Sequence, residues 1–90
     1  MKCAYCGIRR GVQWDHLITR NQARRAVNAA RWREDPKYKV RSCMECNIAK
    51  GPRLRVPESM AHLIPELEAI TDGKYATYDG TAEDLRAVVN

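Results

Sequence analysis

The sequence has few of the residues that build large cores, and none of the long apolar runs that cross membranes. It contains no phenylalanine, 2 tryptophans and 4 tyrosines. No apolar stretch approaches the ~20 residues of a transmembrane helix, so we expect no membrane-spanning segment. The 90 residues are expected to form one small domain that buries about 60–70% of its extended surface. Domains of this size commonly depend on a structural metal ion.

An apolar signal segment is also lacking, because the sequence starts Met-Lys-Cys-Ala-Tyr-Cys. We therefore expect a cytoplasmic protein rather than a secreted one. Thiols stay reduced in a cytosol, so paired cysteines there indicate metal binding more than disulfides.

Acidic residues are scarce in the first part of the chain. Residues 1–55 contain 14 Lys and Arg against 4 Asp and Glu, a net charge of +10, whereas residues 56–90 contain 2 against 7, a net charge of −5. The two parts sum to the overall charge of +5. A basic segment of this kind favours a polyanionic partner, and DNA is the leading candidate. A merely solvated basic surface is the alternative.

The four cysteines form two Cys-x-x-Cys pairs, Cys3 with Cys6 and Cys43 with Cys46. This spacing is typical of a four-thiolate zinc site. A redox dithiol is the alternative, but neither pair stands in the strand-to-helix context of a thioredoxin motif. We predict a structural zinc ion that joins the two distant segments.

Alternating residues predict a first strand over 12–18, which contains Asp15 and His16. Neighbouring side chains of a strand point to opposite faces. The two residues can therefore serve one site only if the strand ends or bulges there. A second strand is predicted over 38–42, and a short helix over 46–50 that is limited by Gly51-Pro52.

A helix is predicted over 19–34, with Thr19 or Asn21 as its N-cap. Arginines lie along one face of this helix, where they are expected to contact DNA phosphates. The predicted phosphate contacts are Arg20, Arg24, Arg31, Arg41 and Lys50.

Residues 56–90 predict a mainly helical C-terminal extension that packs on the zinc-bound part or mediates self-association. Its helical pattern over 57–70 is expected to break or kink at Pro65, and a capping sequence at 81–84 precedes a short helix. His62 is expected to have a structural role, because no other ligand residue stands at metal-binding spacing from it.

The ordered set Cys3-x-x-Cys6, Asp15-His16 and Cys43-x-x-Cys46-Asn47-x-x-Lys50-Gly51 resembles the HNH nuclease family over residues 3–51. The resemblance implies an α+β fold, a small zinc-bound ββα-metal domain over 1–55 with an arginine-rich helix between the strands. Residues 56–90 would form the extension of the same domain. Small HNH proteins of this type are frequent in phages, which would place the chain in the bacterial host cytosol. The approach to Cys43 is also weakly similar to phage endonucleases that resolve branched DNA.

The resemblance also implies the roles of individual residues. His16 is expected to be the general base, and Asp15 and Asn47 the ligands of a catalytic divalent metal, Mg²⁺ or Mn²⁺. Cys3, Cys6, Cys43 and Cys46 are expected to hold the structural Zn²⁺. The family's usual middle Asn has no counterpart here, and Asp35 and Tyr38 are the candidates to replace it.

Elementary chemistry is consistent with these roles. A neutral imidazole is a suitable base near neutral pH. One carboxylate and one amide oxygen would leave Mg²⁺ with open positions for phosphate oxygens and water. We therefore predict a metal-dependent HNH DNA endonuclease or nickase of low sequence specificity, with further specificity from a partner protein or from DNA shape. The alternatives are a non-catalytic zinc-stabilised nucleic-acid-binding module and a thiol redox protein.

Overall fold

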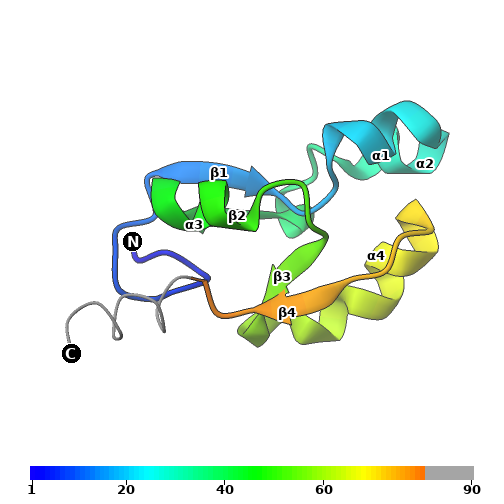
Figure 1. Ribbon diagram of the computed structural model, residues 1–90. Helices are drawn as coiled ribbons and strands as arrows, with labels where there is room; N and C mark the ends of the chain where they lie inside the picture. The colour runs from blue at the N-terminus through cyan, green and yellow to red at the C-terminus, as the bar shows by residue number, and fades with distance from the viewer. Residues whose placement is uncertain (81–90) are drawn as a thin grey trace.

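The computed structural model describes residues 1–80, which contain an N-terminal segment, two small β-sheets and the helices that connect the strands (Figure 1). The chain is thus a small mixed α/β protein with a cluster of four cysteines at one end. The capping sequence predicted at 81–84 and the helix after it lie outside the described residues.

The first sheet consists of β1 (Gln13–His16) and β2 (Lys39–Ser42), as the alternating patterns predicted. The strands are antiparallel, and their register runs without interruption from Gln13 opposite Ser42 to His16 opposite Lys39. β1 ends at His16 because Leu17 and Ile18 turn away into a bend. The strand end expected at Asp15-His16 is therefore present, without a bulge.

The connection between β1 and β2 contains two short helices where one was predicted. They are α1 (Arg20–Arg25) and α2 (Val27–Trp32). Ala26 interrupts the helix with extended backbone angles, φ −140° and ψ 131°. The prediction of one continuous helix was wrong because too little of it is buried to hold it straight: α1 buries no residue, and α2 buries only Ala29. The predicted cap is confirmed, since Thr19 and Gln22 form a reciprocal capping box.

A short 3-10 helix, η1 (Pro36–Tyr38), leads into β2. Helix α3 (Met44–Lys50) begins two residues after the end of β2. Helix α3 begins two residues earlier than predicted, because the Cys43 Sγ accepts the Cys46 backbone N–H at 3.3 Å and acts as the N-cap. Gly51 ends the helix with φ 57° and ψ −139°, a positive-φ conformation that favours glycine.

The second sheet was not predicted. Its strands β3 (Arg55–Pro57) and β4 (Ala76–Tyr78) are parallel and joined through η2 (Glu58–Leu63) and α4 (Ile64–Thr71). The C-terminal extension is therefore less helical than expected, and β3 spans the boundary placed between residues 55 and 56. The helical pattern divides at Leu63–Ile64, so that the predicted break falls just before Pro65.

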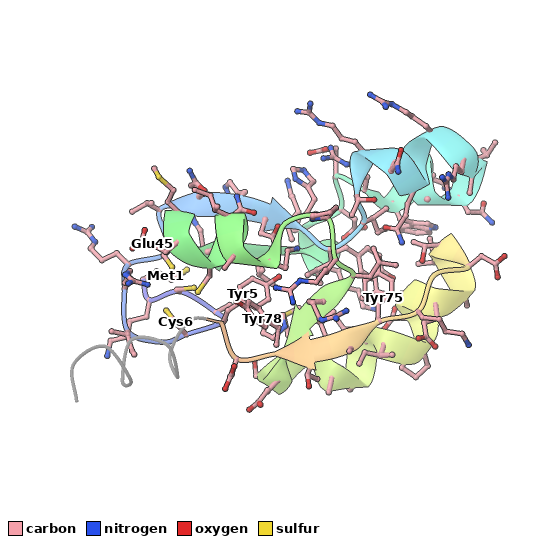
Figure 2. The ribbon with its side chains drawn as sticks, in the orientation of Figure 1. Met1, Tyr5, Cys6, Glu45, Tyr75 and Tyr78 are labelled. Atoms are coloured by element: carbon pink, nitrogen blue, oxygen red, sulfur yellow. The ribbon has the colours of Figure 1, made fainter. Side chains whose placement is uncertain are left out.

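The core runs between the two sheets and reaches the cysteines at one end. Apart from the cysteines and Pro57, the core within residues 1–80 consists of Tyr5, Leu17, Ile18, Ala29, Tyr38, Val40, Val56, Leu63, Leu67 and Tyr75. Tyr5 and Tyr78 lie next to each other with ring centroids 5.9 Å apart, which joins the N-terminal segment to β4 (Figure 2). Within residues 1–80, none of the helices has the length and apolar character needed to cross a bilayer.

Candidate metal centre and adjacent pocket

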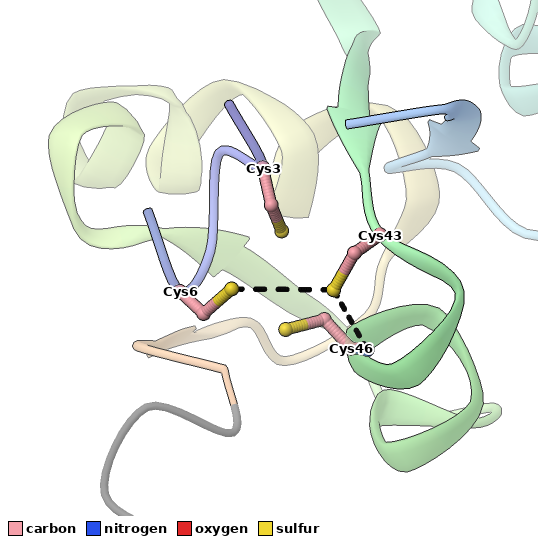
Figure 3. A group of neighbouring side chains, drawn as sticks. All are labelled: Cys3, Cys6, Cys43 and Cys46. Atoms are coloured by element: carbon pink, nitrogen blue, oxygen red, sulfur yellow. Dashed lines mark hydrogen bonds between the residues drawn. The ribbon is translucent and has the colours of Figure 1, made fainter. Parts of the chain in front are cut away.

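The four cysteine sulfurs form one cluster, as the spacing predicted (Figure 3). All four Sγ atoms lie within 4.8 Å of one another, and those of Cys6 and Cys43 are 4.0 Å apart. Zn–S bonds of about 2.3 Å in a tetrahedron place the sulfurs about 3.8 Å apart. The cluster therefore fits one zinc ion, and all four cysteines are free rather than joined in disulfides.

Local backbone structure places each pair of sulfurs. In the N-terminal segment 1–11, the Cys3 N–H donates to the Arg9 carbonyl at 2.8 Å, and the Gly7 N–H donates to the Cys3 carbonyl at 3.0 Å. Gly7 makes this turn with a positive φ of 66°. The other pair comes from the first turn of α3. The cluster therefore joins segment 1–11 to α3 across 37 residues of sequence.

The surroundings of the sulfurs favour the thiolate form of Cys3 and oppose the thiolate form of Cys43. Burial disfavours the Cys3 thiolate, but hydrogen bonds from the backbone at Cys43, Cys6 and Tyr5 outweigh it and lower the pKa of Cys3 to about 7. Burial raises the pKa of Cys43. A bound zinc ion would hold all four as thiolates in a closed site, which is the form that structural zinc takes.

Asp15 points inward from β1 and is 7% exposed. Its Oδ2 accepts hydrogen bonds from the Tyr5 hydroxyl and from the Lys50 Nζ, the latter at 2.8 Å. Burial and the charge of Asp15 raise the pKa of Tyr5, so its hydroxyl stays protonated and able to donate. Both bonds end on Oδ2, so Oδ1 is the carboxylate oxygen that remains for a cation.

Lys50 differs from its prediction as a surface phosphate contact. Its side chain is 3% exposed and forms a buried ion pair with Asp15. The Lys50-Gly51 sequence after the second cysteine pair indicated a positive charge, but not the direction in which the Lys50 side chain points. The ammonium group is turned inward because Lys50 ends α3 on the side that faces β1.

His16 lies beside an acid that the sequence did not single out. Its Nε2 is 2.9 Å from the Glu34 Oε2 and 3.1 Å from the Oε1. Arg33 and Lys39 also pair with Glu34, at 2.9 Å and 3.7 Å. The hydrogen bond with His16 is the main cause that lowers the pKa of Glu34. Glu34 is the first acid after Asp15 in the sequence, and Asp35 follows it directly, so sequence position alone did not single it out.

The residues proposed to replace the middle Asn have other contacts. The Asp35 side chain caps η1 by accepting the Lys37 N–H at 2.9 Å. The Tyr38 hydroxyl donates to the Glu66 carboxylate at 2.8 Å, and the Tyr38 backbone carbonyl accepts the Leu17 N–H at 2.8 Å. Tyr38 thus holds the backbone directly after His16, whereas Glu34 contacts the imidazole itself.

Asn47 projects from α3 toward β1. Its Nδ2 donates to the Gln13 Oε1 at 3.0 Å. This contact uses the amide nitrogen and leaves the amide oxygen as the atom that a hard cation would bind.

Asp15, His16 and Asn47 line one open pocket of about 270 Å³, hereafter the His16 pocket. Its other lining residues are Trp14, Thr19, Arg20, Arg33, Lys50, Gly51 and Pro52. A larger groove of about 520 Å³ shares Thr19, Arg20 and Pro52 with it and includes Arg24 and Arg25. The pocket thus combines oxygen ligands, an imidazole and cations, which is a donor set suited to a divalent metal and a phosphate.

The other predicted phosphate contacts lie outside the His16 pocket. Arg24 belongs to the larger groove, Arg31 packs over the Trp32 ring at 5.3 Å, and Arg41 packs over the Trp14 ring at 4.3 Å.

Comparison of the chain with protein-family models, curated proteins and solved structures finds no match.

Proposed function

We propose that this protein is a metal-dependent DNA endonuclease or nickase of the HNH type, built on a ββα-metal core of β1, β2 and α3. The observation that carries the proposal is that Asp15 and His16 from β1 line the same pocket as Asn47 from α3, although these elements are far apart in the sequence. A zinc ion at the cysteine cluster would fix α3 against segment 1–11. A reducing cytosol, which keeps these thiols available, is the compartment that the proposal implies.

In this proposal His16 activates the water that attacks the scissile phosphate. Glu34 hydrogen-bonds the Nε2 of His16, so the Nδ1 is the ring atom that would take the proton. Such a base is commonly oriented by a third group, and Glu34 supplies that contact here. It would do the work that the family's middle Asn does, through a side chain from the turn that follows α2.

A divalent cation, Mg²⁺ or Mn²⁺, would be held by the Asp15 Oδ1 and the Asn47 Oδ1. When bound, it would supply charge for the pentacoordinate phosphate and for the leaving oxygen. Arg20 and Arg33 lie at the same pocket and would contact the phosphate. The arginines of the adjacent groove would extend the binding of the DNA backbone, with little sequence specificity.

A specific observation favours a second candidate, a zinc-stabilised nucleic-acid-binding module without catalysis. Asp15 already has a structural role, because it balances the buried Lys50 ammonium. A fold that needs Asp15 for this ion pair explains its presence without any catalytic metal.

Nicking of supercoiled plasmid by zinc-loaded protein separates the two candidates. We expect wild-type protein to nick with Mg²⁺ or Mn²⁺, and His16→Ala to lose roughly 10²- to 10⁴-fold of the rate. His62→Ala is the matched control, because His62 is exposed on η2 outside the pocket. Zinc content and DNA affinity should be equal for all three proteins.

Two results would count against the nuclease. Binding of DNA without cleavage by wild-type protein, with any divalent ion, would favour the binding module. Equal cleavage by wild type and His16→Ala would show that another residue is the base.

A further inference from the structure

Trp14 is an exposed tryptophan at the mouth of the His16 pocket. Its side chain projects from β1 on the face opposite to the buried Asp15, and the residue is 51% exposed. Tryptophan is highly buried in most proteins, so a half-exposed ring beside a pocket is unusual. The other tryptophan, Trp32, is half-buried and packs edge-on against Tyr38 with centroids 6.3 Å apart.

Two cations from β2 lie against the Trp14 ring. The guanidinium carbon of Arg41 is 4.3 Å from a ring centroid, and the Lys39 Nζ is 5.5 Å from it. Arg41 is directly opposite Trp14 in the sheet, and Lys39 is two residues along β2 on the same face. These contacts hold the ring in place while half of it stays open to solvent.

The combination of an open aromatic ring and adjacent cations has a specific chemical use. A nucleobase can stack on the ring while the cations contact the phosphates on either side of it. The faces of bases within an intact duplex are already stacked on their neighbours, so the ring gains this contact only from an unpaired base. Trp14 is the one aromatic residue among the large apolar side chains that are exposed within residues 1–80, and the aliphatic ones cannot stack in this way.

We propose that Trp14 is a stacking platform for an unpaired base next to the His16 pocket, and that the protein prefers DNA with single-stranded segments over continuous duplex. The proposal deepens the proposed function and rests on it in one respect: the stacked base lies next to the site of cleavage only if the His16 pocket cleaves DNA. It rests on the exposure of Trp14, its two cations and its place at the pocket.

Binding of labelled DNA without added Mg²⁺ or Mn²⁺ tests the platform separately from cleavage. The probes are an oligo(dT) strand of about 12 nucleotides and a blunt duplex of the same length, at one fixed salt concentration. We expect Trp14→Leu, which keeps an apolar side chain, to weaken oligo(dT) binding roughly 5- to 100-fold and duplex binding much less. Trp14→Tyr should retain most of the affinity, and Trp32→Phe, the matched control, all of it.

Fluorescence gives an independent reading. In Trp32→Phe the only tryptophan is Trp14, and we expect oligo(dT) to quench its emission while the duplex does so far less. An unchanged ratio of oligo(dT) to duplex affinity in Trp14→Leu would overturn the platform, as would unquenched Trp14 emission in the oligo(dT) complex. Preference for oligo(dT) without any cleavage would keep the platform and reject the nuclease, whereas cleavage without this preference would do the reverse.

Discussion

Single residues in this protein combine structural and chemical roles, and Asp15 is the clearest case. Its Oδ2 is used by Tyr5 and Lys50 inside the protein, while the residue also lines the His16 pocket. Removal of one partner of a buried ion pair leaves an uncompensated charge, which costs far more than the loss of an exposed pair. The effect of a substitution here therefore reports on folding before it reports on catalysis.

Replacement of Lys50 by methionine tests the buried pair. We expect Lys50→Met to lower the free energy of unfolding by about 3–5 kcal/mol, because Asp15 remains buried without its cation. The double substitution Asp15→Asn with Lys50→Met should recover most of this loss, since neither charge remains. Urea unfolding of the zinc-loaded proteins measures both values. A loss below about 1 kcal/mol would mean that water screens the pair as it does at a surface.

Replacement of Glu34 tests its proposed role as a positioning residue for His16. We expect Glu34→Ala to lower kcat about 10-fold with little change in KM, because the imidazole loses the contact that orients it. Glu34→Gln should recover much of the rate, since its amide can still hydrogen-bond the ring. The measurement is steady-state nicking, and an equal loss for Ala and Gln would point to the charge of Glu34 rather than to orientation.

At the scale of elements, local sequence patterns predicted the features that depend on residues close together in the sequence. Alternation gave β1 and β2, and the cysteine spacing predicted the cluster. The pairing of β3 with β4 was missed because it joins segments about 20 residues apart, each of only three residues, and too short to show a period. Glu34 and the inward direction of Lys50 were missed for the same reason, since both depend on tertiary contacts.

A glycine after β4 approaches the cysteine cluster so closely that it offers a test of the packing between these elements. A Cβ atom on Gly80 would lie 2.6 Å from the Cys46 Sγ and 2.9 Å from the Cys6 nitrogen. We expect Gly80→Ala to destabilise the protein by roughly 1–3 kcal/mol beyond its backbone cost and to weaken zinc binding, because the sulfurs must move. Competition with a chromogenic chelator measures the zinc affinity.

Gly7→Ala is the matched control for this substitution. Gly7 has a similar positive φ, 66° against 74° for Gly80, but a Cβ there would meet nothing within 4 Å. It should therefore show only the cost of a left-handed alanine, about 1–2 kcal/mol. Equal effects at both glycines would show that contact with the cluster contributes nothing.

At the scale of the whole molecule, the chain is elongated, with extents of 45 × 22 × 21 Å. The cysteine cluster lies at one end, where it joins segment 1–11 to α3, and Gly80, two residues after β4, lies close to it (Figures 2 and 3). Apart from Pro57, the core within residues 1–80 has 13 buried apolar residues, and three of them are cysteines of this cluster, namely Cys3, Cys43 and Cys46, so zinc would organise a large share of a small core. The loss of zinc should then affect the whole chain rather than one loop.

Removal of zinc tests whether the two sheets fold as one unit. We expect a strong chelator to abolish the fold cooperatively, with β1, β2 and α3 losing hydrogen-exchange protection together with β3, α4 and β4. The reason is that Tyr5, in the segment held by the cysteines, packs on Tyr78, while the Tyr75 hydroxyl donates to the Leu17 carbonyl at 2.6 Å. The first contact ties the second sheet to the segment that zinc holds, and the second ties it to Leu17, directly after β1. Exchange measured before and after chelation gives the answer, and persistent protection of β3, α4 and β4 alone would show that the C-terminal part folds independently of the metal.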